Sequence, residues 1–152
     1  MKKHHSDEQL RATNPGADHA RESDHAFAQQ LREVLREQAL GLFEETARDA
    51  LASGIQATLE LQLEHEQAPR LGLNVRHPGD ETCSYYRIVG DLPRRGVIHQ
   101  EFYADSGVSR NQAAQLSSVN QKVIDTHLAA LFSGAFALSL AHLRKRNPAG
   151  FW

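Results

Sequence analysis

The chain has 152 residues, of which 40% are apolar and 24% are charged, and its formal net charge is −2. This length suits a single domain. A protein that binds bulk polyanions would be far more basic, and an acidic disordered chain would hold fewer large apolar side chains, so the composition disfavours both classes. Cys83 is the single cysteine, which excludes an intrachain disulfide and is typical of a reducing compartment.

The N-terminal residues 1–23 are predicted to form a disordered tail. Leu10 is their only large aliphatic side chain besides Met1. A segment that buries so little apolar surface cannot offset the entropy that it loses on ordering. We expect a single domain over residues 24–147, followed by a short C-terminal tail over residues 148–152.

A first helix is predicted from Asp24, where apolar residues begin to recur at steps of three and four. Asp24 can cap its start, and Ser53-Gly54 is a typical stop. From Ile55 the apolar period changes to two, which is typical of half-buried strands. Four strands are predicted, each bounded by turn-forming residues, over residues 59–64, 71–76, 82–89 and 96–104. Their short connections favour an antiparallel meander.

A long last helix is predicted over residues 109–146, and it ends in three basic residues before Asn147-Pro148. Small residues form one narrow stripe of this helix, and large apolar residues lie opposite. The stripe consists of Ala130, Gly134, Ala137 and Ala141. The large face is expected to cover the sheet, and the small face to let another helix approach closely. Two partners suit this stripe, the first helix of the same chain or the last helix of a second copy.

Together these elements predict an α+β fold, in which a first helix and a long last helix flank a four-stranded antiparallel sheet in the order α-β-β-β-β-α. The most apolar run, residues 128–143, is shorter than the roughly 20 residues that a membrane span needs. No apolar segment follows Lys2 and Lys3, as a signal peptide would require. We therefore expect a cytoplasmic protein that does not associate with membranes.

The solvent-facing side of the sheet is the first candidate binding surface. Alternation along the strands suggests that polar and aromatic side chains gather there. They include Arg76, Arg87, His99, Glu101 and Tyr103. Such a set could perform acid–base chemistry. The sequence contains neither a nucleophile motif nor a glycine-rich phosphate loop, so a protein-binding face or a plain solvated surface suits the pattern better, and we do not expect an enzyme.

Residues 113–128 resemble the helix-turn-helix of LuxR-type bacterial regulators. The matching positions are Ala114, Val119, Lys122, Ile124 and His127. Leu116 and Val123 depart from the family pattern, and the same stretch also suits one uninterrupted helix. The resemblance implies a DNA-reading helix, with phosphate contacts from the basic end of the chain. The residues concerned would be Asn120, Gln121, Lys122, Arg144, Lys145 and Arg146.

The function that the sequence favours is that of a non-enzymatic binding module, such as an adaptor, a small chaperone or an assembly factor. It would bind a protein partner through the sheet face or through the last helix, and the last helix also offers a route to a homodimer. The chain loosely resembles small acidic secretion chaperones, which are dimeric α+β proteins. A DNA-binding regulator is the alternative. The nine histidines show no metal-ligand spacing, so neither a metal nor a cofactor is expected.

Overall fold

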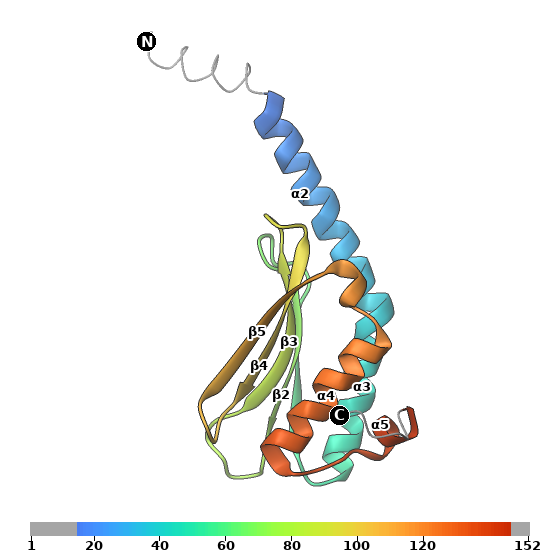
Figure 1. Ribbon diagram of the computed structural model, residues 1–152, viewed down its shortest axis with the longest axis vertical. Coiled ribbons are helices and arrows are strands. Elements are labelled where there is room, and N and C mark those ends of the chain that lie inside the picture. Colours follow the sequence, from blue (N-terminus) through green and yellow to red (C-terminus); the bar gives the residue numbers. More distant parts are fainter. Residues whose placement is uncertain (1–14, 147–152) are drawn as a thin grey trace.

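The computed structural model describes residues 15–146 and confirms an α+β fold. Two layers pack face to face, a five-stranded antiparallel sheet and a layer of helices that lie on one side of it (Figure 1). The N-terminal helix extends well beyond the end of the sheet (Figure 1). Within the described range, no helix combines the length and the apolar character needed to cross a membrane.

The N-terminal helical segment is continuous, with one π-helical turn in its middle. Its three parts are α2 (Pro15–Val34), η1 (Leu35–Ala39) and α3 (Leu40–Ala52). The helix begins at Pro15 rather than at the predicted Asp24, and proline is well suited to a first helical turn. The second part of the predicted tail is therefore helical. The rest of that tail and the predicted C-terminal tail lie outside the described residues.

The helix ends where the sequence predicts. The Ser53 amide donates to the carbonyls of Asp49 and Ala50, and Gly54 follows with φ of 84°, a conformation that glycine adopts without strain. The Ile55 amide then bonds to the Ala50 carbonyl at 2.9 Å and leads the chain into the first strand.

The sheet is a meander in which strands adjacent in sequence are adjacent in space. Its strands are β1 (Gln56–Gln62), β2 (Arg70–Arg76), β3 (Ser84–Asp91), β4 (Gly96–Tyr103) and β5 (Val108–Gln115). The first four correspond to the four predicted strands. The last helix was predicted to begin at residue 109, but this prediction is wrong, because β5 pairs with β4 over its whole length. Nearly all its side chains are exposed, so it lacks the apolar alternation that identifies the others.

The predicted long last helix is in fact three helical elements. They are η2 (Leu116–Ser118), α4 (Gln121–Phe136) and α5 (Ala141–Arg146). The Asn120 side chain caps α4 by accepting the Val123 amide at 2.9 Å. α4 ends at Phe136, its C-cap Ala137 has φ of 51°, and the Leu138 amide donates to the Phe132 carbonyl at 3.2 Å. This left-handed cap stops the helix without a glycine.

The core lies between the two layers. α3 packs on β1 and β2, α4 packs on β3 and β4, and the two helices also contact each other. The first and last helices therefore cover one face of the sheet, as predicted. In the centre, Phe43 of α3 stacks on Tyr86 of β3 with their ring centroids 5.5 Å apart. Both side chains are fully buried, together with Leu31, Leu35, Leu71, Leu73, Ile88, Ile124, Leu128 and Phe132.

Candidate functional site

The structure divides the predicted binding residues of the sheet between its two faces. Two lie on the open face, Arg76 and Arg87, and three point toward the helices, His99, Glu101 and Tyr103. The register explains the second group, because Glu101 pairs with Tyr86, which is buried under α3. The prediction that these three residues lie on the solvent-facing side is therefore wrong.

On the open face, side chains from three strands form a continuous row, which we call the arginine–aromatic row. It consists of Glu60 on β1, Arg87 and Tyr85 on β3 and Phe102 on β4. The rings of Phe102 and Tyr85 stack with centroids 5.4 Å apart. The guanidinium carbon of Arg87 lies 3.7 Å from the centre of the Tyr85 ring, and its Nη2 lies 3.3 Å from Glu60 Oε2. The row is thus preformed by stacking, cation–π and ionic contacts.

Gly72 on β2 makes this row possible. The register places Gly72 between Glu60 and Arg87. A Cβ on Gly72 would come within 2.8 Å of the Arg87 Cβ and 3.4 Å of Glu60 Oε2. The bare backbone at this position therefore lets the two charged side chains meet across β2.

The open face around the row carries more positive than negative charge, with Arg70, Arg76 and Arg87 against Glu60 and Asp91. Arg70 Nη1 lies 3.9 Å from Glu60 Oε1, so two guanidinium groups share one carboxylate. The buried Nε of Arg87 has no hydrogen-bond partner among the described residues. Arg76, at the end of β2, donates to the Asp80 carbonyl and leaves the rest of its guanidinium free for other acceptors. The described helices all lie on the other side of the sheet (Figure 1).

The helix-covered face contains a polar network between β3, β4 and α4. The rings of Tyr86, His99 and His127 are nearly parallel, and the two histidine centroids are 4.8 Å apart. His99 Nδ1 lies 2.7 Å from the Tyr86 hydroxyl, and His99 Nε2 lies 2.8 Å from Ser118 Oγ. Ser118 donates its own proton to the Gln115 carbonyl, so Nε2 of His99 donates to Ser118. The pKa of His99 is lowered to about 4, so at neutral pH its Nδ1 carries no proton and accepts the Tyr86 hydroxyl. His99 is therefore neutral.

Glu101 is the carboxylate of this network. Its Oε2 lies 2.9 Å from His127 Nδ1, and its Oε1 accepts the Tyr103 hydroxyl at 2.5 Å. Burial by itself raises the pKa of Glu101, but the hydrogen bonds from His127 and Tyr103 and the charge of Arg110 outweigh it, so the pKa is lowered. Burial, followed by the nearby His127, lowers the pKa of His99 to about 4, although Glu101 opposes the shift.

These contacts hold α4 on the sheet and leave little surface for a substrate. His99 is 2% exposed and Glu101 is 8% exposed. The polar atoms of both residues are engaged within the protein, those of His99 with Ser118 and those of Glu101 with Tyr103 and His127. In the part of the chain that the structure describes, no three His, Cys, Asp or Glu side chains gather so that they could hold a metal ion.

Sequence reasoning missed Tyr86, Ser118 and His127 as members of the network, although one signal was present. His127 lies three residues after Ile124 and four before Leu131, both fully buried, so helical spacing places it on the buried face of α4. A polar side chain at such a position requires a partner inside the protein.

The structure divides the small-residue stripe of the predicted last helix between separate elements. Gly134 faces Tyr103, and a Cβ on Gly134 would come within 2.6 Å of the Tyr103 ring. Ala137 is the C-cap of α4, and Ala141 lies in α5, so only Ala130 and Gly134 share a helix. The prediction of one continuous stripe is therefore wrong.

The segment 113–128 does not fold as a helix-turn-helix, because residues 113–115 belong to β5. Asn120 uses its side chain to cap α4 and to donate to the Ser117 carbonyl at 2.8 Å. Gln121 and Lys122 are exposed at the start of the helix. The motif that suggested DNA recognition is thus absent, and DNA binding through these residues stays a prediction.

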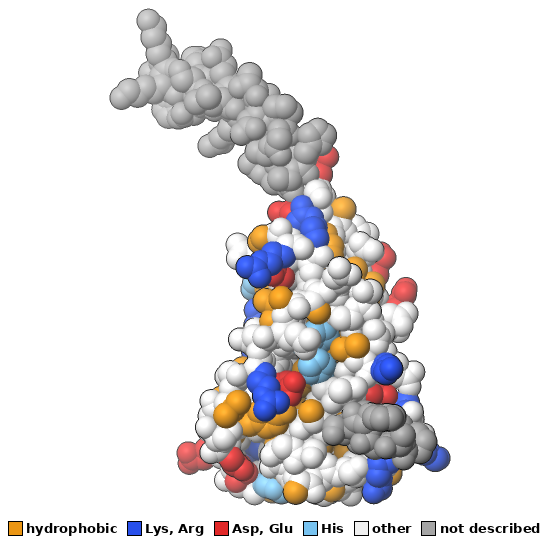
Figure 2. All heavy atoms as spheres, viewed as in Figure 1, with side chains coloured by type: hydrophobic (Ala, Val, Ile, Leu, Met, Phe, Trp, Pro, Cys, Tyr) orange, Lys and Arg blue, Asp and Glu red, His pale blue; other side chains and the backbone are white. Residues whose placement is uncertain are grey.

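The basic end of the chain is partly engaged within the protein. Arg146 binds both carboxylate oxygens of Asp125, at 2.7 and 2.9 Å, and also binds Glu45 at 3.0 Å. Arg144 and Lys145 are exposed. Figure 2 shows blue and red side chains interspersed over the face that carries α4. That pattern differs from the concentrated basic patch typical of nucleic-acid binding.

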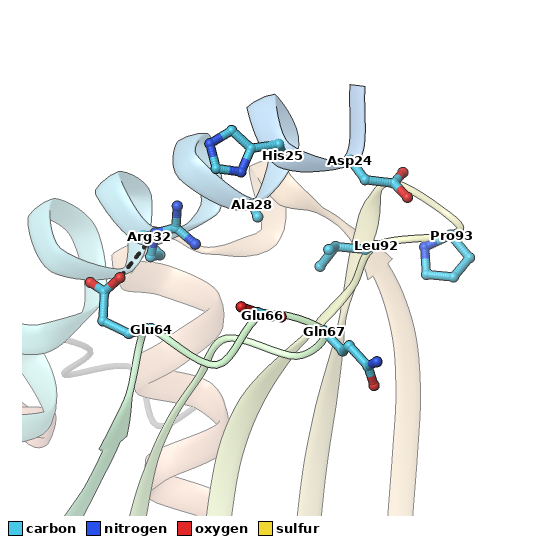
Figure 3. A pocket seen from close by; sticks show the side chains of 9 residues that line it. All are labelled: Asp24, His25, Ala28, Arg32, Glu64, Glu66, Gln67, Leu92 and Pro93. Carbon is cyan, nitrogen blue, oxygen red and sulfur yellow. Dashed lines mark ion pairs between the residues drawn. The ribbon is translucent and has the colours of Figure 1, made fainter. Parts of the chain in front are cut away.

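A wide groove of about 750 Å³ lies under the projecting part of the N-terminal helix. Figure 3 shows its walls, with Asp24, His25 and Arg32 on α2 above, and Glu64 on the segment after β1 below. Arg32 Nε and Glu64 Oε2 are 4.0 Å apart across the groove. The turn after β3 contributes Leu92 to the third wall. None of the residues predicted from the sequence as functional lines this groove.

Comparison of the chain with protein-family models, with curated proteins and with solved structures found no match. Of the surfaces formed by the residues described above, the open face of the sheet combines a preformed row of side chains with two arginines that share one carboxylate.

Proposed function

We propose that this protein is a non-enzymatic protein-binding module that docks an acidic segment of its partner on the open face of the sheet. The observation that carries the proposal is the arginine–aromatic row, which lies on a face that the described helices leave uncovered. Arginine and aromatic side chains are enriched at the centres of protein interfaces. Because the row is preformed, docking costs little additional side-chain entropy.

Charge complementarity supports an acidic partner. The chain as a whole has a net charge of −2. Its open sheet face nevertheless carries three arginines, Arg70, Arg76 and Arg87, against Glu60 and Asp91. Asp91 is paired with Arg94 at 3.9 Å, so Glu60 alone balances the central arginines. A carboxylate from a partner would supply acceptors for Arg87 and Arg70.

The class of module is that of an adaptor, a small chaperone or an assembly factor. The single cysteine supports action in the reducing cytoplasm. The buried network of His99 and Glu101 supports a structural role for these residues, since both are nearly inaccessible.

The experiment that tests the proposal is selection of a phage-displayed peptide library on the full chain. Selected peptides are expected to be enriched in Asp and Glu, with an affinity that falls at least about tenfold in Arg87→Glu, because a carboxylate then faces carboxylates. Lys122→Glu on α4 makes the same charge change elsewhere and is expected to leave the affinity within about twofold. Backbone amide shifts should map the peptide to β3 and β4.

Two results would contradict the proposal. One is a set of selected peptides without acidic enrichment, and the other is an equal affinity for Arg87→Glu and the wild-type chain. The Lys122→Glu control also tests the alternative function, because DNA binding through α4 would weaken in that variant while the Arg87 variant kept it.

A further inference from the structure

We infer that two copies of this chain pair through the outer edge of β5 and so continue the sheet across a twofold axis. β5 is the last strand of the sheet and has β4 as its neighbour on one side only. Its outer edge therefore presents backbone N–H and C=O groups that no strand in the described range pairs. This surface is distinct from the arginine–aromatic row, and the inference does not depend on the proposed function.

The edge of β5 has only one of the devices that keep edge strands apart, the charged side chain of Arg110 on the helix-side face. Native edges are usually short, or interrupted by proline, a bulge or lysine. β5 has eight residues without proline or lysine, and its register with β4 is unbroken from Gly96↔Gln115 to Tyr103↔Val108. α4 packs on β3 and β4. Val108 at the start of β5 is 43% exposed.

The side chains of β5 are complementary to those of a second copy of the same strand. On the helix-side face they follow the order apolar, polar, polar, apolar, as Val108, Arg110, Gln112 and Ala114. Antiparallel pairing centred on Asn111 places Val108 opposite Ala114 of the second copy, and Arg110 opposite Gln112.

This register places no like charges directly opposite each other, and the two Arg110 side chains become diagonal neighbours. Arg110 is the only charged residue of β5, and pairing about Asn111 keeps the two arginines from facing each other. On the open face, Ser109 meets Ala113 of the second copy and the two Asn111 amides meet at the axis, where they can hydrogen-bond. A second copy thus pairs the backbone edge of β5 and also places complementary side chains opposite each other.

Disulfide trapping tests this register. Opposed residues of antiparallel strands have Cα atoms about 4.5 to 5.5 Å apart, which a disulfide can span. Asn111→Cys in a Cys83→Ser background is therefore expected to form a covalent dimer on mild oxidation. Gln115→Cys in the same background is the matched control, because it lies on the same strand and face but about 26 Å from its counterpart along the strand axis. It is expected to stay monomeric.

A charge exchange at the axis tests the association without a covalent bond. Native mass spectrometry of the wild-type chain is expected to show the mass of two chains. Asn111→Lys and Asn111→Glu are each expected to show the mass of one chain, because like charges meet at the axis, and an equal mixture of the two is expected to recover a dimer. Both variants are expected to remain folded because Asn111 is exposed, and thermal unfolding followed by circular dichroism checks this.

The inference would be overturned if the wild-type chain stayed monomeric at about 100 μM, which is about a hundred times a dimer dissociation constant of about 1 μM. So would cross-linking of Gln115→Cys as fast as that of Asn111→Cys, dimers that persist in both charged variants, or a mixture that stays monomeric. Loss of peptide binding in Arg87→Glu would not affect any of these results, so the failure of one proposal is distinguishable from the failure of the other.

Discussion

The ring of Tyr103 lies against Gly134, so closely that a Cβ on Gly134 would come within 2.6 Å of the Tyr103 Cε1. Tyr103 belongs to β4 and Gly134 to α4. The ring is held in place because the Tyr103 hydroxyl donates to Glu101 at 2.5 Å. This contact sets how closely α4 approaches the sheet, so the glycine serves packing within the chain.

Gly134→Ala is expected to lower the free energy of unfolding by about 1 kcal/mol. Replacing a helical glycine by alanine stabilises the helix by up to about 1 kcal/mol, but overpacking against Tyr103 costs about 1 to 3 kcal/mol. Gly41→Ala in α3 is the matched control, because nothing lies within 4 Å of its added Cβ, and it should stabilise the protein. Urea unfolding measures both, and equal stabilisation by the two substitutions would rule out the Tyr103 contact.

Acidification is expected to destabilise the protein through His99. Burial and the nearby His127 lower its pKa to about 4 in the folded state, whereas the unfolded value is about 6.5. Between these values the unfolded chain binds more protons, so the free energy of unfolding falls as the pH falls, by on the order of 2 kcal/mol. Urea unfolding across this range measures the slope. His99→Gln keeps a donor and an acceptor but does not titrate, so an unchanged slope in that variant would contradict the assignment.

Asp125→Ala is expected to lower the free energy of unfolding by about 2 kcal/mol, because it removes the buried partner of Arg146. Asp125 is 4% exposed and binds the guanidinium in bidentate fashion, which ties α5 to α4. Glu45→Ala is the control, since the Glu45 side chain is 40% exposed, and it is expected to cost less than about 1 kcal/mol. Amide hydrogen exchange in α5 reports its detachment, and similar losses in both variants would refute this account.

Gly72→Ala is expected to cost about 1 to 2 kcal/mol of stability and to weaken binding of acidic peptides. The added Cβ would meet the Arg87 Cβ at 2.8 Å, and that atom cannot rotate away because it is fixed to the backbone. Asn74→Ala, on the same strand and face, should change stability by less than about 0.5 kcal/mol. Calorimetric titration with a selected peptide measures the affinity, and wild-type stability and affinity in Gly72→Ala would show that the row tolerates the methyl group.

The register of the sheet explains which parts of the candidate site could be predicted. Alternation on β2 and β3 correctly placed Arg76 and Arg87 on the open face. On β4 the alternation is ambiguous, because Val97 lies on one side and Ile98 and Phe102 on the other. The apolar content of the two faces of β4 is therefore too similar to show which face packs against the helices. The pairing with β3 settles the question.

The missed strand and the broken last helix have different causes. β5 is exposed on both faces, so its side chains carry no hydrophobic period, and its strand conformation depends on the backbone of β4. The last helix stops at Ala137 in a left-handed conformation that usually signals glycine or asparagine. An alanine gives no such signal, and the Leu138 amide secures the cap through the Phe132 carbonyl.

The sequence by itself determined the α+β class, the end of the first helix at Gly54 and the first four strands, because hydrophobic period and turn chemistry are properties of neighbouring residues. Only the tertiary structure decided that Glu101 and His99 are buried. Burying a polar group costs free energy unless it is hydrogen-bonded. The partners here are Ser118 for His99 and His127 for Glu101, and both come from elements that follow β5 in the chain.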